Sequence, residues 1–305
     1  MGAPENFSGL IPKRSTNQID ILNAFSVQPA PMDFVWHGFL AGTVGALVAP
    51  GATGKSLYAL QASMSVAGAD VDGCDLLGLK PTRSGQVIYL AGEDPVQALH
   101  HRLFSIGKHL STDARIAIAQ NLTIESIVGR RMNVMDARHM KYLIEYCAGA
   151  RLIVLDTLSR IHQLDENSNG DMAQLVSMLE YLSVQTGGTI LFLHHVSKGS
   201  ASLGQSDQQQ AARGASALID NARWCGFVSR MTVDESEKFS SDRVGTPIGD
   251  QRRYYVRVGT SKQNYGVQLD DHWYKFGDGG VLLPAGVQPA KVGAKPRKGG
   301  DRDEA

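Results

Sequence analysis

Three absences narrow the classes of protein to which this 305-residue chain can belong. Its few cysteines, Cys74, Cys147 and Cys225, are scattered without a Cys-x-x-Cys spacing, so they predict a reducing compartment and no disulfide framework. No apolar run approaches the roughly 20 residues of a membrane-spanning helix, and the N-terminus lacks the basic and apolar regions of a signal peptide. We therefore expect a cytoplasmic protein that does not associate with membranes.

The chain also lacks an excess of charge of either sign. Thirty Lys and Arg residues balance thirty Asp and Glu residues, which gives a formal net charge of zero. A neutral total does not indicate nucleic-acid binding, but it leaves room for a local basic loop. Apolar residues, in contrast, make up 43% of the chain, which is enough for one large core.

Short, almost continuously apolar runs alternate with stretches of helical length and pattern. The runs are residues 44–48, 86–90, 152–155 and 189–193, and the helical stretches are residues 56–67, 95–110 and 170–185. Strands that are apolar on both faces belong to parallel sheets covered by helices on both sides. The sequence therefore predicts an α/β fold with a mostly parallel sheet, in which ligands bind at the carboxyl ends of the strands.

The ends of the chain differ in character from this alternating region. Short strand-like pieces near the C-terminus predict an antiparallel extension of the same sheet, at residues 224–231, 252–259, 267–276 and 281–283. Near the N-terminus, Asn17 is expected to cap a short helix that ends at Phe25. We predict an N-terminal tail, helix and connector over residues 1–39, a core domain over 40–284, and a disordered Gly-, Pro- and Lys-rich tail over 285–305.

A phosphate-binding motif follows the first apolar run. It consists of Ala49, Pro50, Gly51, Ala52, Thr53, Gly54, Lys55 and Ser56. Glycines at 51 and 54 let backbone N–H groups turn toward phosphate oxygens, at the N-terminus of the next helix. Lys55 is predicted to reach the outer phosphates of ATP, and Ser56 to bind Mg²⁺. The motif departs from the usual pattern at Ala49, where glycine is usual, and Gly-Lys-Ser also occurs by chance in glycine-rich loops.

Acidic residues follow two other apolar runs. Asp156 is predicted to hold Mg²⁺, directly or through water, although an Asp that ends a buried strand is also common as a turn residue. Glu93 is predicted to be the base that activates the attacking water. The competing interpretation is that Glu93 and its neighbour Asp94 cap the helix that begins near Pro95. Asp94 alone would suffice for such a cap.

Basic and imidazole side chains near these acids are further candidates for the nucleotide site. Arg102, on the helix that follows Glu93, is a candidate to lie against the adenine base, although an ordinary solvated arginine fits the pattern nearly as well. His194 and His195 end the fourth run, and adjacent strand residues point to opposite faces, so we do not expect them to bind one metal ion. One histidine is expected to be packed and the other to face the γ-phosphate.

Seven short motifs, considered together, are more specific than the phosphate-binding loop alone. They read Val-Ala-Pro-Gly-Ala-Thr-Gly-Lys-Ser, Ile-Tyr-Leu-Ala-Gly-Glu-Asp-Pro, Leu-Asp-Thr-Leu, Phe-Leu-His-His, Asp-Gln-Gln-Gln, Asp-Asn-Ala-Arg-Trp and Ser-Lys-Gln-Asn-Tyr-Gly, beginning at residues 48, 88, 155, 192, 207, 220 and 261. Their succession closely resembles the RepA family of plasmid replicative DNA helicases. The resemblance extends from about residue 17 to about residue 284.

The resemblance implies a RecA-like P-loop core in a homohexameric ring that hydrolyses ATP at subunit interfaces and moves 5′ to 3′ along single-stranded DNA. By motif match, Glu93 is the catalytic base, His195 is the phosphate sensor, and Arg223 is an arginine finger that reaches into the neighbouring site. Lys262 is a second candidate to act in trans. A salt-bridged strand arginine is the alternative for Arg223. The partners expected of such a helicase are single-stranded DNA and a replication initiator or primase of the same replicon.

The loops after the third and fourth predicted strands are the expected DNA contacts. The first covers about residues 160–170 and begins with Arg160, and the second covers residues 197–213, with Lys198 and Arg213 near its ends. Six weakly basic loops that converge on one channel can follow phosphates although each chain is neutral. A disordered surface loop is the alternative. Two other functions stay open: a RecA-like recombination or repair ATPase, and a regulatory ring that remodels proteins.

Overall fold

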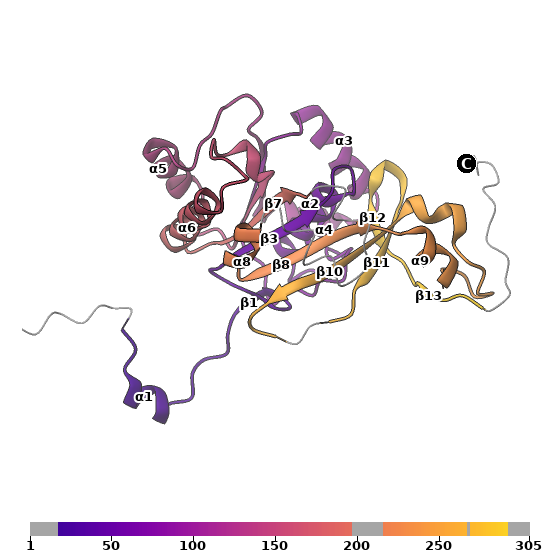
Figure 1. Ribbon diagram of the computed structural model, residues 1–305, viewed down its shortest axis with the longest axis horizontal. Helices are drawn as coiled ribbons and strands as arrows, with labels where there is room; N and C mark the ends of the chain where they lie inside the picture. Colours follow the sequence, from indigo (N-terminus) through magenta and orange to yellow (C-terminus); the bar gives the residue numbers. More distant parts are fainter. Residues whose placement is uncertain (1–17, 197–215, 267–268, 292–305) are drawn as a thin grey trace, which may run out of the picture. The chain divides into compact units, whose positions relative to one another are not determined.

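The structure is a computed structural model that describes residues 18–196, 216–266 and 269–291 (Figure 1). The chain divides into two units, residues 1–32 and 33–305. In the first unit, helix α1 (Ile21–Ser26) begins after Asp20, whose carboxylate accepts a hydrogen bond of 3.1 Å from the N–H of Asn23. The predicted cap at Asn17 was therefore wrong, because Asp20 supplies the acceptor that the first turn of the helix needs.

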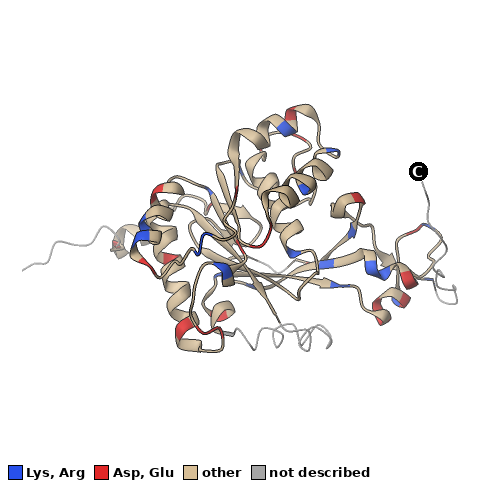
Figure 2. Ribbon diagram, turned by 90° about the horizontal axis from the view of Figure 1, so that it is seen from above, with Lys and Arg blue, Asp and Glu red and all other residues tan. Residues whose placement is uncertain are grey.

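Within the described residues, nine strands form one sheet in the second unit (Figures 1 and 2). Along the sheet they are β12 (Leu282–Pro284), β11 (His272–Phe276), β10 (Tyr255–Gln263), β8 (Trp224–Arg230), β3 (Val44–Ala49), β7 (Thr189–His195), β6 (Leu152–Asp156), β4 (Val87–Ala91) and β5 (Leu122–Ser126). The strands from β8 to β5 run parallel, and β10, β11 and β12 continue the sheet antiparallel. The predicted fold class, a mostly parallel α/β sheet with a C-terminal antiparallel extension, is confirmed.

Helices pack on both faces of this sheet. The apolar cluster on one face includes α2 (Lys55–Ala67), α3 (Val96–Gly107) and α4 (Thr112–Asn121), and that on the other includes α5 (Ala137–Tyr146), α6 (Asn169–Thr186) and α8 (Ser216–Asn221). Strand β3 contributes to both clusters in alternation, with Leu47 in the first and Ala46 and Val48 in the second. The continuous apolar character of this strand is therefore explained by burial on both faces.

Three features of the second unit differ from the sequence analysis. Strand β8, expected among the antiparallel pieces, pairs in parallel with β3 and antiparallel with β10, so it is the strand at which the direction changes. Strand β5 was not predicted, because it is a half-buried edge strand with polar residues in its sequence. Past the predicted start of the disordered tail at residue 285, β13 (Gln288–Pro289) pairs with β9 (Phe239–Ser240).

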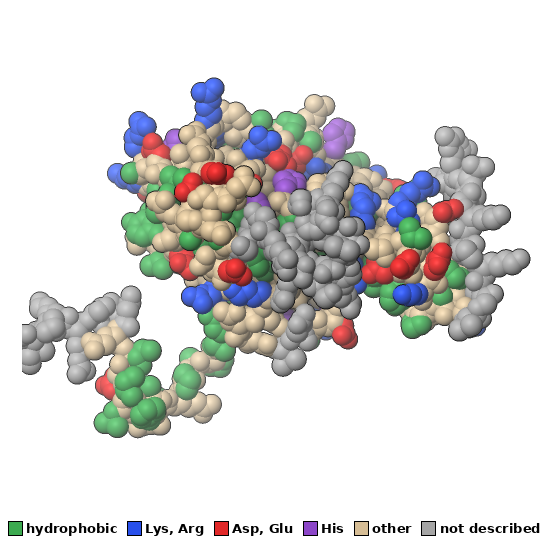
Figure 3. Space-filling view, viewed as in Figure 1, with side chains coloured by type: hydrophobic (Ala, Val, Ile, Leu, Met, Phe, Trp, Pro, Cys, Tyr) green, Lys and Arg blue, Asp and Glu red, His purple; other side chains and the backbone are tan. Residues whose placement is uncertain are grey.

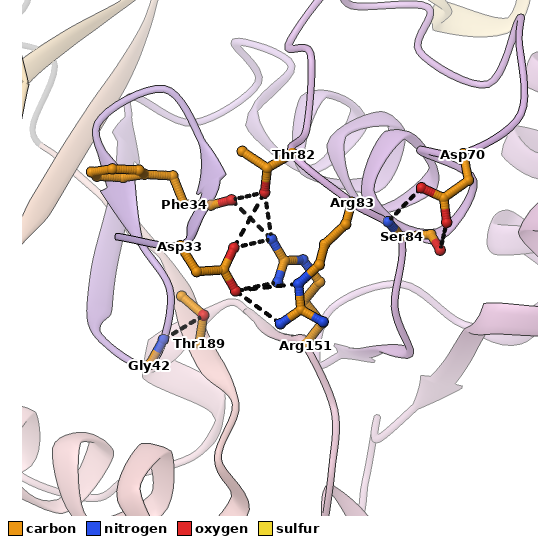
Figure 4. Close-up of polar contacts among 9 residues, drawn as sticks. All are labelled: Asp33, Phe34, Gly42, Asp70, Thr82, Arg83, Ser84, Arg151 and Thr189. Atoms are coloured by element: carbon orange, nitrogen blue, oxygen red, sulfur yellow. Dashed lines mark hydrogen bonds and ion pairs between the residues drawn. The ribbon is translucent and has the colours of Figure 1, made fainter. Parts of the chain in front are cut away.

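An ion-pair cluster lies beside the hairpin of β1 (Phe34–Trp36) and β2 (Phe39–Leu40), close to the start of β6 (Figure 4). The Asp33 carboxylate accepts two hydrogen bonds of 2.9 Å from Arg151 and two, of 2.8 and 3.3 Å, from Arg83. The Arg151 side chain, only 4% exposed, also donates to the Phe34 carbonyl and the Thr82 hydroxyl. Hydrogen bonds from Arg151, and then from Arg83, hold the pKa of Asp33 well below its usual value. Asp33 is also the first residue of the second unit, whereas the core domain was predicted to start at residue 40.

The charged residues lie mostly on helices and loops in Figure 2, which leaves the strands largely apolar. On the face shown in Figure 3, basic and acidic side chains are interspersed, in keeping with the zero net charge of the chain. In the part of the chain that the structure describes, no helix combines the length and the apolar character required to span a bilayer.

Candidate active site

The phosphate-binding loop joins β3 to α2 at the carboxyl edge of the parallel strands. Ala52 and Gly54 have positive φ angles of 62° and 98°, in the left-handed region that glycine adopts most easily. A Cβ atom at Gly54 would lie 2.7 Å from the Phe276 ring, so this position also requires glycine for space. The hydroxyl of Thr53 donates to the carbonyl of Pro50 and closes the turn. Left-handed residues at the start of a helix form concave anion-binding sites from backbone N–H groups.

Lys55, the first residue of α2, has a buried side chain that is 4% exposed. Its Nζ atom has no hydrogen-bond partner among the described residues. Burial lowers the pKa of this ammonium to about 8, against the attraction of Asp156 and Glu93. A buried cation without acceptors is unfavourable by itself. The residue therefore fits a site for an anionic ligand such as a nucleotide phosphate, whose oxygens supply the missing acceptors.

Asp156, at the end of β6, connects the phosphate-binding loop to the neighbouring strand β4. Its Oδ1 atom accepts a hydrogen bond of 3.0 Å from the Ser56 hydroxyl, and its Oδ2 atom accepts one of 2.5 Å from the Tyr89 hydroxyl. Burial raises the pKa of Asp156, while the hydrogen bonds from Tyr89 and Ser56 oppose that rise. A hydroxyl beside a carboxylate is a ligand pair that suits Mg²⁺, which takes its other ligands from phosphates and water. Tyr89 was not among the site residues predicted from the sequence.

Glu93 follows β4 and faces the same cavity as the phosphate-binding loop. Its Oε2 atom lies 3.6 Å from Nε2 of His195, and its Oε1 atom lies 3.5 Å from Nε of Arg160. The side chain is 36% exposed, so water reaches the carboxylate. A carboxylate in this position can accept a proton from a water molecule.

Neither Glu93 nor Asp94 caps the following helix, which was the alternative interpretation of these two residues. Helix α3 has Pro95 at its N-cap position, without a side-chain hydrogen bond to its first turn. Asp94 instead accepts hydrogen bonds from both terminal nitrogens of Arg102, and one of these bonds measures 2.9 Å. Asp94 and Arg102 therefore form a paired wall of the cavity beside Glu93.

The cavity above the phosphate-binding loop has a volume of about 370 Å³. It is lined by Pro50, Ala52, Thr53, Gly54, Lys55, Ser56, Leu57, Glu93, Asp94, Arg102, His195, Arg230, Phe276 and Gly280. Of the last three, Arg230 ends β8, Phe276 ends β11, and Gly280 ends the short helix η7 (Asp278–Gly280). Arg230 donates to the carbonyls of Ala52 and Arg253, and its guanidinium lies 5.7 Å from the centre of the Phe276 ring. Arg230 and Phe276 were not predicted from the sequence, because neither belongs to a local motif.

Arg223 and Lys262 lie at the opposite edge of the sheet. Arg223 is exposed, and its N–H donates to the carbonyl of Val44, at the start of β3, over 2.8 Å. Because β8 and β3 are parallel, this is the edge away from the phosphate-binding loop. The Lys262 ammonium donates to the carbonyls of Ile219 and Asp220 near the C-terminus of α8, at 3.2 and 2.6 Å. Neither residue lines the cavity of its own chain.

Comparison with known proteins identifies the family. The sequence model of one protein family, described as AAA domain, matches residues 13–201, which is more than half of the chain. The chain belongs to the AAA domain family. Membership implies a nucleotide-binding ATPase domain, and the described part of the matched segment contains the phosphate-binding loop, Glu93, Asp156 and His195.

Two solved structures resemble this AAA domain in fold. One is described as an ATPase domain, with a TM-score of 0.56 and 14% identity over 86% of this chain and 95% of that chain. The other is described as the structure of a DnaB-like replicative helicase and its interactions with primase, with a TM-score of 0.60 and 14% identity over 87% of this chain and 68% of that chain. At this identity the likeness establishes a shared fold.

The remaining predicted residues of the AAA domain take different positions. Ala49 is the buried last residue of β3, and Gly51 follows it in the loop, but neither lines the cavity. His194 is buried, which lowers its pKa to about 4, while His195 faces the cavity. Arg160 ends the short helix η2 (Leu158–Arg160), next to Glu93. The predicted DNA contacts Lys198 and Arg213 lie outside the described residues.

Proposed function

We propose that this AAA domain is an ATP-dependent replicative DNA helicase that works as a hexameric ring. The observation that carries the proposal is the buried, unpartnered Lys55 ammonium beside the Ser56–Asp156 pair, in a cavity that Glu93 also faces. These groups provide attraction for phosphate, ligands for Mg²⁺ and a base for water, which are the parts that ATP hydrolysis requires. The fold shared with a DnaB-like replicative helicase supports the choice of helicase over other ATPases.

Each side chain then has a distinct role within one subunit. Lys55 and the backbone N–H groups of the loop hold the outer phosphates, and Ser56 and Asp156 hold the metal ion. Mg²⁺, when bound, offsets the negative charge that develops on the transferred phosphoryl group. Glu93 takes a proton from the attacking water, and His195, 3.6 Å from that carboxylate, senses the state of the γ-phosphate.

The motif at residues 220–224 does not bring its arginine to the cavity of its own chain. In the proposed ring, the neighbouring subunit supplies this cation. Arg223 is exposed at the edge of the sheet remote from its own phosphate-binding loop. In a ring, that edge of one subunit is placed against the cavity of the next, so Arg223 acts as the finger that stabilises the transition state. Lys262, fixed beside the same edge by α8, acts with it in trans.

Single-stranded DNA is the proposed polymer that the ring follows in the 5′ to 3′ direction. Arg160 is the proposed contact within the described residues, and Lys198 and Arg213 are proposed from the sequence alone. We propose a role in plasmid-type DNA replication because the seven sequence motifs follow one another as in the plasmid helicases that the chain resembles. A replication initiator or primase is the proposed protein partner, and the DnaB-like helicase of similar fold is itself described with its interactions with primase.

Stimulation of hydrolysis by DNA tests this proposal against a regulatory ring that remodels proteins. Phosphate release is measured with and without single-stranded oligodeoxythymidine, and Lys55→Ala serves as the inactive control. A helicase is expected to hydrolyse ATP several-fold faster with DNA, because the strand contacts are coupled to the catalytic residues. An identical rate with and without DNA contradicts the assignment. A RecA-like recombination or repair ATPase shares this stimulation and is separated by strand unwinding.

A further inference from the structure

A second cavity lies on the other side of Glu93 from the phosphate-binding loop. Its volume is about 350 Å³, and it is lined by Gly92, Glu93, Ile127, Val128, Gly129, Arg131, Ser159 and Arg160. We propose that this second cavity binds a backbone phosphate of single-stranded DNA, and that Arg160 couples its occupancy to the freedom of Glu93. The inference rests on the proposed function and adds a phosphate subsite and a positioning residue to it.

Glu93 is shared between the two cavities through its two carboxylate oxygens. Oε2 lies near His195 on the nucleotide side, and Oε1 lies 3.5 Å from Nε of Arg160 on the other side. A guanidinium that contacts one carboxylate oxygen holds the carboxylate in place and occupies that oxygen, so the group is less free to turn toward a water molecule. Arg160 therefore restrains the proposed catalytic base when no other anion is near.

The backbone beneath Arg160 is fixed, whereas its side chain is free to change partners. Thr157, at the N-cap position of η2, donates its hydroxyl to the carbonyl of Leu193 on β7 over 2.7 Å, and Leu158 is buried in the core. The Arg160 side chain itself is 58% exposed. Because the backbone is fixed and the guanidinium is exposed, the Arg160 side chain can move between Glu93 and a ligand without any rearrangement of the sheet.

Gly92 provides the space for this contact. A Cβ atom at Gly92 would lie 2.6 Å from Cβ of Arg160 and 3.3 Å from the carbonyl oxygen of Asp156. Any larger residue at this position would push η2 away from the end of β4. The close approach of Arg160 to Glu93 therefore depends on a glycine directly before the proposed base.

The charges around the second cavity favour an anion. Arg131 has an exposed side chain and a left-handed backbone with φ of 49°, and it forms no ion pair within the described ranges of the chain. Its neighbour Arg130 is already paired with Glu125 over 2.5 Å. Arg131 and Arg160 thus face the cavity with the Ser159 hydroxyl nearby. Guanidinium groups bind phosphate oxygens through paired hydrogen bonds, which suits a phosphodiester.

Occupancy of the second cavity then changes the state of the base. A bound phosphodiester competes for Arg160, the ion pair with Oε1 of Glu93 weakens, and the carboxylate becomes free to accept a proton from water. Hydrolysis is consequently slow in the absence of DNA and faster when a strand is held. The coupling operates within one subunit, over the 3.5 Å between Arg160 and Glu93.

The test measures ATP hydrolysis by the full-length assembled protein, with and without single-stranded oligodeoxythymidine. For Arg160→Gln we expect a DNA-independent rate several-fold above that of the wild type and a stimulation ratio close to one. For Arg131→Ala we expect the DNA concentration at half-maximal stimulation to rise about tenfold, from the loss of one charge-assisted contact. Arg138→Gln, a change to an exposed arginine paired with Asp136 outside both cavities, is expected to leave both quantities at wild-type values.

Several results would overturn the inference while leaving the proposed function in place. One is a wild-type stimulation ratio in Arg160→Gln, and another is an equal loss of the basal and stimulated rates, which indicates a merely structural role. Stimulation of the wild type by inorganic phosphate alone, without DNA, assigns the cavity to free phosphate and also overturns it. If DNA does not stimulate hydrolysis by the wild type, the result contradicts the proposed helicase function itself.

Discussion

Arg223 and Arg230 stand beside opposite ends of strand β8. Arg230 ends the strand at the carboxyl edge, where it lines the nucleotide cavity of its own chain and donates to the carbonyl of Ala52. Arg223 precedes the strand at the amino edge and is exposed beside Val44. One strand therefore brings one arginine to the candidate site of its own chain and presents the other outward.

This arrangement predicts complementation between two inactive variants. Arg223→Ala and Lys55→Ala are each expected to lose nearly all ATP turnover. Mixed rings of the two are expected to regain part of it, because some interfaces combine an intact phosphate-binding loop with an intact Arg223 from the next subunit. Steady-state phosphate release from co-assembled rings, sized by light scattering, measures the effect.

A matched mixture distinguishes action in trans from action in cis. Arg230 and Lys55 line the same cavity of one chain, so mixing Arg230→Ala with Lys55→Ala restores no complete site beyond the residual activity of Arg230→Ala. Full turnover by Arg223→Ala rings alone contradicts the finger assignment. So does a mixture of Arg223→Ala and Lys55→Ala that assembles and stays inactive.

Replacement of Lys55 by methionine is predicted to stabilise the protein in the absence of nucleotide. The pKa of Lys55 is lowered from 10.5 to about 8 by burial, so the charged lysine disfavours the folded state below pH 8, and the effect disappears as the pH rises toward 10.5. At pH 7 we expect Lys55→Met to raise the free energy of unfolding by about 2–3 kcal/mol, since one pKa unit corresponds to about 1.4 kcal/mol. Urea denaturation without and with ATP measures it, and ATP is expected to stabilise the wild type only.

The control for this experiment is Lys141→Met, on the exposed face of α5. Its ammonium is largely solvated and lies 3.9 Å from Glu145, so the free energy of unfolding is expected to change by less than about 0.5 kcal/mol. A Lys55→Met variant that is less stable than the wild type at pH 7 without nucleotide would mean that the ammonium has acceptors within the folded protein.

Tyr89→Phe is predicted to weaken the binding of Mg²⁺ without removing hydrolysis. The change keeps the ring in the core but deletes the 2.5 Å hydrogen bond that orients Oδ2 of Asp156. Loss of such a contact to a metal-binding carboxylate weakens metal affinity about 10-fold to 100-fold. A titration of ATPase activity with Mg²⁺ at fixed ATP should show the higher midpoint. Tyr142→Phe, on the surface of α5, is the control, and an unchanged midpoint in Tyr89→Phe contradicts the prediction.

Asp33→Asn is predicted to destabilise the fold in a pH-dependent way. The pKa of Asp33 is lowered in the folded state, so its contribution is present above the unfolded value of about 4 and is lost as the pH falls below it. The buried Arg151 loses its carboxylate partner, but Asp33 is 38% exposed, so we expect a loss of about 1–2 kcal/mol at pH 7. Denaturation at pH 7 and pH 3 should show the difference shrinking, with Glu145→Gln as a control that has little effect at either pH. A difference that grows on acidification contradicts the prediction.

The main features of the fold follow from local sequence patterns. Strands β3, β4, β6 and β7 are continuous apolar runs because both of their faces are buried, and the loop before Lys55 has the glycine spacing of a phosphate site. Local patterns do not state which strand pairs with which. This is why β8 was assigned to the antiparallel extension although its neighbour β3 runs parallel to it.

The contacts that complete the site join residues far apart in the chain. Tyr89 meets Asp156 because β4 and β6 are adjacent, and Phe276 approaches Gly54 from β11, which no motif near either residue signals. The contact between Arg160 and Glu93 likewise depends on the position of η2 against β7. Sequence patterns thus identified the residue types of the candidate site, whereas the sheet order determines which of them touch.

The most direct test of the helicase assignment is unwinding of tailed duplex DNA by the purified protein. Substrates carry a single-stranded tail at either the 5′ or the 3′ end of the strand on which the ring loads, and strand displacement is followed with ATP and Mg²⁺. The account predicts ATP-dependent displacement on the substrate that admits 5′ to 3′ movement, and none with Lys55→Ala. Active, DNA-stimulated ATP hydrolysis without displacement on either substrate would contradict the assignment and favour a recombination or repair ATPase.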